Sequence, residues 1–220
     1  TMTINKAIIL GTMANYLIDL GKGEEAQQYA EYIQAFFTTE KMKTTGAAID
    51  AKEILAKTYF FNSAFNNALT LEQEVIESRN SLLGDNNAGN IMSYVVLGNI
   101  YNAIDEKQKA YETYEKSVSL AQTIYGNKHP NTATMLNHLA LAYSDAGDFN
   151  KALETCVSAY DIFKDKYGEN SSMLAPTLSR ISEISLSLGD AENADKAISK
   201  AIELCVQKFG EDNYIHAQLL

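Results

Sequence analysis

The sequence predicts an all-α protein, an α-α superhelix (solenoid) of about five antiparallel helix pairs. Three observations predict this fold class. One pattern recurs every 42 residues, the apolar residues within each copy follow helical spacing, and the 220 residues include only two prolines. A single helix pair buries little apolar surface, whereas stacked pairs share one continuous core. The sequence therefore indicates a repeat array.

Glycine marks the period of this array. Gly84, Gly126, Gly168 and Gly210 are spaced 42 residues apart, and each follows a large apolar residue. The same spacing, extended backwards without a gap, gives five copies of a helix core: GTMANYLIDLG (11–21), EILAKTYFFNS (53–63), VVLGNIYNAID (95–105), NHLALAYSDAG (137–147) and SRISEISLSLG (179–189). We therefore expect a single array over residues 1–220. Its units are expected at about 1–40, 41–82, 83–124, 125–166 and 167–208, followed by the start of a capping or sixth-unit helix at 211–220.

Each copy combines a helix, a tight turn and a second helix. In the fourth copy, Leu136, Leu139, Ala140 and Tyr143 fall on one apolar helix face. Gly147 suits the left-handed residue that ends a helix, and the aspartate after it suits the N-cap of the next helix. Applied to all copies, the pattern predicts helices at 4–20, 23–38, 44–61, 64–82, 88–103, 106–124, 131–146, 149–166, 172–188 and 191–208.

The order of residue types in each copy resembles the tetratricopeptide repeat (TPR). The signature is carried by Leu97, Gly98, Tyr101, Ala110 and Tyr114 in the third copy and by Leu139, Ala140, Tyr143, Ala152 and Ala159 in the fourth. A period of 42 in place of the usual 34 resembles the kinesin-light-chain-like subclass. HEAT-type repeats have a similar period, but they lack this small-residue code and the tight Gly-Asp turn. The sequence departs from the signature at Met13, Leu17, Glu72 and Ser185.

The resemblance implies that a peptide or partner protein binds in a concave groove lined by the first helix of each pair. Counted from the small residue of each copy, the groove positions are three before it and one, four and five after it. The partner-binding residues expected from this rule are Asn15, Asp19, Glu53, Lys57, Phe60, Asn99, Asn102, Asn137, Leu141, Asp145 and Glu183. The same rule also places Gly11, Phe61 and Val95 in the groove.

Two features of this residue set have alternative interpretations. Asn15, Asn99, Asn102 and Asn137 form a ladder of carboxamides that can pair with the backbone of an extended peptide, or they are solvated polar residues. The Phe60–Phe61 pair supplies an aromatic anchor, or one of its rings belongs to the core. Lys57 is one of few cations at these positions, which disfavours an acidic peptide as the partner.

Composition restricts the other partners and the compartment. The formal net charge is −10 and there is no cluster of Lys or Arg, which disfavours nucleic acid and anionic membranes. Cys156 and Cys205 lie on apolar faces of expected helices, so we expect two buried thiols in a reducing, cytoplasmic compartment. No apolar run is long enough for a transmembrane helix.

Motifs for catalysis, cofactors and metals are missing from the sequence. The three histidines, His129, His138 and His216, have no paired-ligand spacing, and no GxGxxG or Walker-type loop occurs. We therefore expect no enzymatic activity, no cofactor and no metal.

The sequence leaves three functions open. The first is a non-catalytic protein–protein interaction scaffold. The second is a ligand- or peptide-sensing regulatory domain of a larger signalling or effector protein, because the opening Thr-Met and the helical pattern at the end suggest a piece of a longer chain. The third is a structural module that associates with itself through the ends of the array or an exposed second helix.

Overall fold

The computed structural model describes residues 3–37 and 45–210, which form ten α-helices and one short 3-10 helix. They are α1 (Ile4–Asp19), α2 (Gly23–Phe36), α3 (Gly46–Phe61), α4 (Phe65–Leu83), α5 (Gly89–Ala103), α6 (Lys107–Tyr125), α7 (Pro130–Asp145), α8 (Phe149–Tyr167), η1 (Ser172–Leu174), α9 (Ala175–Ser187) and α10 (Ala191–Phe209). The ten helices expected from the sequence are confirmed to within a few residues. The helix expected at 211–220 lies outside the described residues.

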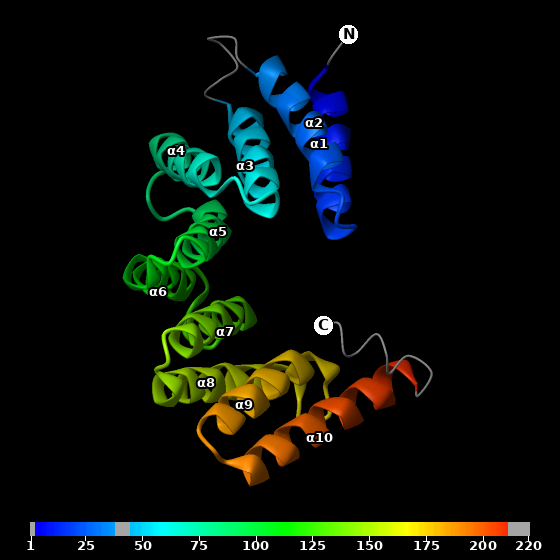
Figure 1. Ribbon diagram of the computed structural model, residues 1–220, viewed down its shortest axis with the longest axis vertical. Helices are drawn as coiled ribbons and strands as arrows, with labels where there is room; N and C mark the ends of the chain where they lie inside the picture. The colour runs from blue at the N-terminus through cyan, green and yellow to red at the C-terminus, as the bar shows by residue number, and fades with distance from the viewer. Residues whose placement is uncertain (1–2, 38–44, 211–220) are drawn as a thin grey trace. The chain divides into compact units, whose positions relative to one another are not determined.

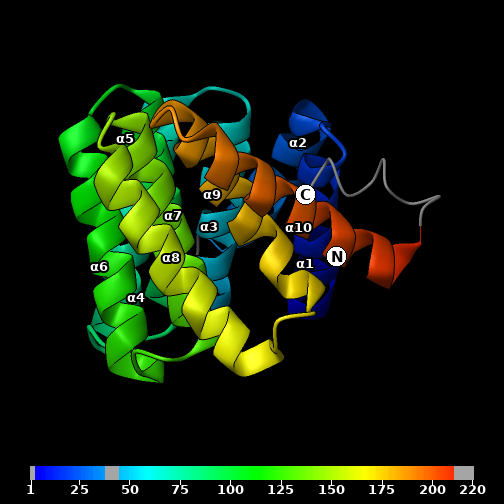
Figure 2. The same ribbon diagram turned by 90° about the horizontal axis from the view of Figure 1, so that it is seen from below.

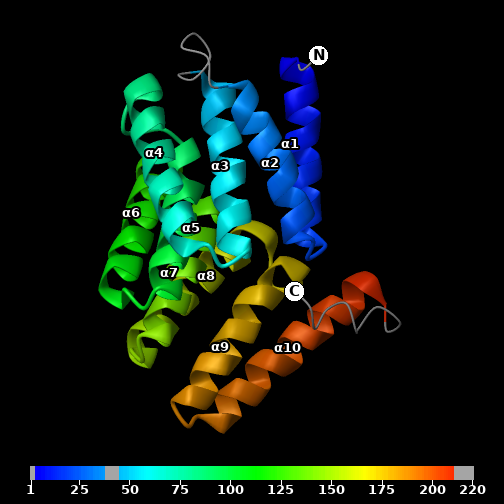
Figure 3. The ribbon, with the colours of Figure 1, turned by 45° about the horizontal axis from the view of Figure 1, so that its top comes forward.

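The helices group into two compact units, residues 1–113 and 114–220, with the boundary inside α6 (Figure 1). In the first unit α1 packs on α2 and α3 on α4, and in the second α7 packs on α8 and α9 on α10. Figures 2 and 3 show the partners of these pairs side by side. Successive pairs also contact each other within a unit, through α2 and α3, α4 and α5, and α8 and α9. Each unit is thus built from stacked helix pairs, as the sequence predicts.

Below, α1, α3, α5, α7 and α9 are called the A helices, and α2, α4, α6, α8 and α10 the B helices. Small residues at matching positions hold the two kinds together. In the B helices, Ala26, Ala68, Ala110, Ala152 and Ala194 are all buried. In the A helices, Ala14, Ala56, Gly98, Ala140 and Ser182 are buried as well. These positions allow close approach of two helix backbones, and they confirm the 42-residue register.

The same left-handed turn joins the A and B helices of every pair. Its central residue has a positive φ in all five copies: Gly21, Ser63, Asp105, Gly147 and Gly189. The residue after it donates a backbone hydrogen bond across the end of the A helix, as Asp148 does to Tyr143 at 2.9 Å. Asp148 and Asp190 then cap the next helix, accepting from the backbone N–H of Lys151 and Asn193. The turn and the caps expected from the sequence are therefore confirmed.

Ser63 and Asp105 hold this turn in spite of their side chains, with φ of +61° and +62°. A side chain in this conformation costs about 1 kcal/mol, and serine tolerates it less well than aspartate. We therefore expect Ser63→Gly to raise the free energy of unfolding by about 1 kcal/mol, measured by urea denaturation. The reverse change at the equivalent position, Gly147→Ala, should lower it by a similar amount. Destabilisation by Ser63→Gly would contradict this account of the turn.

The two prolines mark the starts of A helices. Pro130 is the first residue of α7, and Pro176 lies in the first turn of α9. The expected start of the ninth helix near Ser172 is occupied by η1, and the α-helix begins at Ala175. Proline lacks an N–H, so it is accommodated in a first turn where that donor has no helical acceptor.

Candidate interaction surface

The A helices of each unit form a continuous row. In the first unit α1 contacts α3, and α3 contacts α5; in the second unit α7 contacts α9. No such contact joins the B helices α2 and α4, or α8 and α10. The A helices of a unit therefore lie next to one another on one side of the stack. Their side chains that point away from the B helices form one surface in each unit. These two A-helix faces are the surfaces on which the expected binding residues are located.

The position three residues before the small residue faces inward, between neighbouring helices. Val95 is buried, and a side chain added at Gly11 would meet Ile54 Cδ1 at 2.8 Å. Asn137 donates from Nδ2 to Thr177 Oγ1 at 2.7 Å, which links α7 to α9. The expectation that Gly11 and Val95 line a groove is therefore wrong, because Val95 is buried and Gly11 lies against Ile54 of α3.

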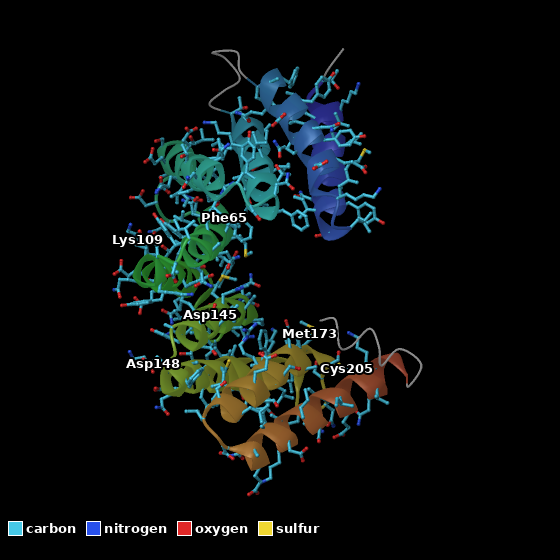
Figure 4. The ribbon with its side chains drawn as sticks, viewed as in Figure 1. Phe65, Lys109, Asp145, Asp148, Met173 and Cys205 are labelled. Atoms are coloured by element: carbon cyan, nitrogen blue, oxygen red, sulfur yellow. The ribbon has the colours of Figure 1, made fainter. Side chains whose placement is uncertain are left out.

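The positions one and five after the small residue reach the surface. Asn15, Asp19, Asp145 and Glu183 are exposed, and Lys57, Asn99 and Leu141 are half-buried. Figure 4 shows Asp145 at the end of α7, close in sequence to Asp148 at the start of α8. Asn102, at position four, accepts from Lys107 Nζ at 2.9 Å.

The two rings of the Phe60–Phe61 pair have different surroundings. Phe60 is half-buried and its ring lies 5.7 Å from that of Phe65. Phe61 is 43% exposed, and its ring lies beside Gly23 at the start of α2. Phe60, one of the two rings expected to form an anchor, thus packs partly against the start of α4.

Lys57 belongs to an ionic network in the first unit. Its Nζ lies 2.7 Å from Glu53 Oε1, and the other oxygen of Glu53 lies 2.7 Å from Arg79. Arg79 is buried and also donates to Ser93 Oγ at 2.8 Å and to the carbonyl of Gly89 at 3.1 Å. Burial acts to raise the pKa of Glu53, but Lys57 and Arg79 outweigh it and lower that pKa below its usual value. Glu53 and Lys57 therefore couple the A-helix face to the core of the unit.

Comparisons with known proteins identify the repeat. Tetratricopeptide repeat models match residues 106–165 and 175–205. The chain is a tetratricopeptide repeat protein. Its fold is similar to that of a Podosopora anserina protein described as a kinesin light chain with nearly identical TPR-like repeats, at a TM-score of 0.80 and 17% identity over 94% of this chain and 98% of the other. The sequence-based recognition of the kinesin-light-chain-like kind is thereby confirmed.

Two further structures share the fold. BtubC (BKLC) from P. vanneervenii matches with a TM-score of 0.78 and 14% identity, over 94% of this chain and 82% of that one. MamA from Desulfovibrio magneticus RS-1 matches with a TM-score of 0.60 and 16% identity, over 92% and 97% of the two chains. A search of curated proteins gives no significant match.

Glu72 is the most unusual residue of this TPR array. It stands at a B-helix position that holds Ala30, Tyr114 and Cys156 in other repeats, and like them it is buried. Neither carboxyl oxygen has a hydrogen-bond partner in the described part of the chain. Burial, and then the negative charge of Glu53, raise the pKa of Glu72 to about 7, although Ser93, Lys57 and Arg79 oppose the rise. Glu72 is therefore largely protonated in a mildly acidic solution.

The positions of Glu72 and Arg79 in the sequence indicate the ionic network of the first unit, although neither is among the residues expected in the groove. Glu72 and Arg79 lie seven residues apart on α4, on the same face as the buried Ala68, Val75 and Ile76. Two ionisable residues on a stripe that packs into the core must either pair or stay neutral, because an isolated buried charge is very unfavourable. The apolar periodicity of α4 therefore identifies both residues before their partners are known.

The thiols of the TPR array and the imidazole of His138 are held in packed surroundings. Both cysteines are buried, as expected. Burial raises the pKa of Cys156 to about 12, so the group stays a thiol. Burial, and then the positive charge of Arg180, lower the pKa of His138. No group of three His, Cys, Asp or Glu side chains that could hold a metal ion occurs among residues 3–37 and 45–210, and no helix there is long and apolar enough to cross a bilayer.

Proposed function

We propose that this chain is a non-catalytic scaffold that holds a peptide or a surface segment of a partner protein on an A-helix face. One observation carries the proposal. Successive A helices contact one another within each unit, and the residues one and five positions after the small residue are exposed or half-buried in every repeat. Rigid helices that present side chains in a row can bind a chain laid across them without rearrangement.

The charges on these faces favour a neutral or basic segment. Asp145 and Glu183 are exposed on the second unit, and Asp19 is exposed on the first. The cation among the expected binding residues, Lys57, is already paired with Glu53 at 2.7 Å. An acidic ligand would therefore meet negative potential on approach, whereas a basic one would be attracted. The buried thiols support a reducing, intracellular setting for this interaction.

Charge reversal on one face tests this function. The partner is first identified by capture on the 220-residue protein and mass spectrometry, and its affinity is then measured by calorimetry. Asp145→Lys combined with Glu183→Lys is expected to weaken binding at least about tenfold, because both carboxylates lie on the proposed face.

A matched control changes the same number of charges elsewhere. Glu154→Lys combined with Asp161→Lys alters two exposed residues of α8, and it should change the affinity less than about twofold. Circular dichroism and thermal unfolding verify that both variants fold. A loss of binding in the α8 variant together with full binding in the A-face variant would assign the interaction to the B helices and refute the proposal.

A further inference from the structure

Helix α1 presents an apolar stripe to the surface. Ile9 is 61% exposed, Met13 43%, Tyr16 62% and Leu20 53%. The opposite face of α1 packs into the first unit through Ala7, Gly11 and Ala14. Three of these side chains lie on α1 and the fourth, Leu20, is its C-cap. Four exposed large apolar side chains in a row are unusual on a surface without a partner. The stripe of Ile9, Met13, Tyr16 and Leu20 is called the α1 seam below.

The 42-residue register shows what kind of surface the α1 seam is. The residues equivalent to Ile9, Met13 and Tyr16 in the next three A helices are buried: Ala51, Leu55 and Thr58 in α3, Ser93, Leu97 and Ile100 in α5, and Met135, Leu139 and Ala142 in α7. In α3 and α5 the preceding B helix packs against the A helix. The α1 seam is thus the interface that later repeats use to receive a helix, and a helix is the occupant whose shape it fits.

The spacing within the seam favours a second α1 as that helix. The four residues are separated by four, three and four positions, so the pattern reads the same in both chain directions. An antiparallel copy places Ile9 against Leu20 and Met13 against Tyr16, and every apolar side chain meets another. This spacing also alternates as in the core of two packed helices. A patch that complements itself in this way is what a two-fold dimer requires.

The charge distribution agrees with this pairing. The chain carries a formal net charge of −10, but α1 contains one lysine and one aspartate. Two acidic molecules repel each other through most of their surfaces, and this repulsion is weakest where the charges of each partner cancel. Helix α2, by comparison, begins with Glu24 and Glu25 and contains no basic residue.

We infer that the chain forms a two-fold dimer in which α1 packs antiparallel on α1 of a second copy through Ile9, Met13, Tyr16 and Leu20. This interface uses a different part of the array from Asp145 and Glu183, so it stands or falls independently of the proposed partner binding.

Sedimentation equilibrium of the 220-residue protein over a range of concentrations tests the dimer. Wild type should show a concentration-dependent monomer–dimer equilibrium. Met13→Glu combined with Tyr16→Glu should weaken the dimer at least about a hundredfold, because four carboxylates then face each other in an apolar interface. Both residues are exposed in the monomer, so thermal unfolding should stay close to that of wild type. The control Leu186→Glu alters a residue of α9 that is 61% exposed, and it should leave the dimer unchanged.

Disulfide trapping tests the orientation. A mixture of Met13→Cys and Tyr16→Cys proteins should form the mixed crosslinked dimer faster than either protein alone forms its own, and the native cysteines are buried. Preferential crosslinking of each single variant to itself would overturn the antiparallel pairing. A wild type that stays monomeric at all concentrations, or a dimer that survives Met13→Glu with Tyr16→Glu, would overturn the interface and assign the α1 seam to another helix.

Discussion

Replacing Arg79 with alanine is expected to lower the free energy of unfolding by about 3–5 kcal/mol, the usual effect of removing one partner of a buried ion pair. The guanidinium lies 2.7 Å from Glu53 and donates to Ser93 Oγ and to the carbonyl of Gly89. Its removal leaves three acceptors from α3 and α5 without this donor in the interior of the first unit. Urea denaturation at pH 7, followed by circular dichroism, measures the change.

A surface ion pair of the same length provides the control. Lys52 Nζ lies 2.7 Å from Glu74, also between α3 and α4, and both side chains are partly exposed. Lys52→Ala should therefore cost less than about 1 kcal/mol, because solvent screens the attraction and hydrates the remaining carboxylate. Equal effects of the two substitutions would show that burial contributes nothing to the strength of the Arg79 network.

A double-mutant cycle separates the ionic network from simple loss of volume. Arg79→Met keeps most of the side-chain bulk, and Glu53→Gln removes the charge that faces it. The coupling energy of the pair should exceed about 1 kcal/mol, as expected for two groups in one hydrogen-bond network. If the two effects simply add, the contribution of Arg79 is packing alone.

The sequence predicts the helices and the packing code because both depend on local spacing. The five alanines from Ala26 to Ala194 and the five turn residues from Gly21 to Gly189 follow one 42-residue period. In the structure all five alanines are buried, and all five turn residues have a positive φ. This holds even at Ser63 and Asp105, where the residue type argues against a left-handed turn. The period is therefore stronger evidence for the turn than the identity of any one residue.

The binding face is predicted less well because it depends on how helices cross. Asn137 fits the carboxamide ladder by position, but its Nδ2 donates to Thr177 on the neighbouring A helix. Lys57 fits the groove by position, but it pairs with Glu53 and so joins the network of Arg79. Thr177 lies on another helix than Asn137, and Arg79, which holds the other oxygen of Glu53, lies on another helix than Lys57. Spacing within a single helix does not specify such partners. Exposed residues such as Asn15, Asp145 and Glu183 remain predictions for partner binding.

Glu72 makes stability depend on pH in the range where most carboxylates no longer titrate. The pKa of its carboxyl is raised from 4.5 to about 7 in the folded chain, so unfolding releases a proton between these two values. The folded state binds more protons than the unfolded state there, so stability must fall as pH rises. The loss amounts to about 3 kcal/mol and is complete above about pH 7. Glu53, whose pKa is lowered, acts in the opposite sense and only at more acidic pH.

Glu72→Gln should remove this dependence while keeping the shape of the side chain. We expect the variant and wild type to have similar stability at pH 5, and the variant to be more stable by about 3 kcal/mol at pH 8. The groups that act on Glu72 are unchanged in the variant: Glu53 and Lys57 on α3, Arg79 on its own helix and the Ser93 hydroxyl on α5. Urea denaturation at pH 5, 6, 7 and 8 measures both curves.

The exposed Glu74→Gln is the matched control and should follow wild type. Parallel curves for Glu72→Gln and wild type would mean that Glu72 is ionised in the folded protein. Arg79 would then have to stabilise the charges of both Glu53 and Glu72, although its guanidinium contacts only the carboxylate of Glu53 of these two.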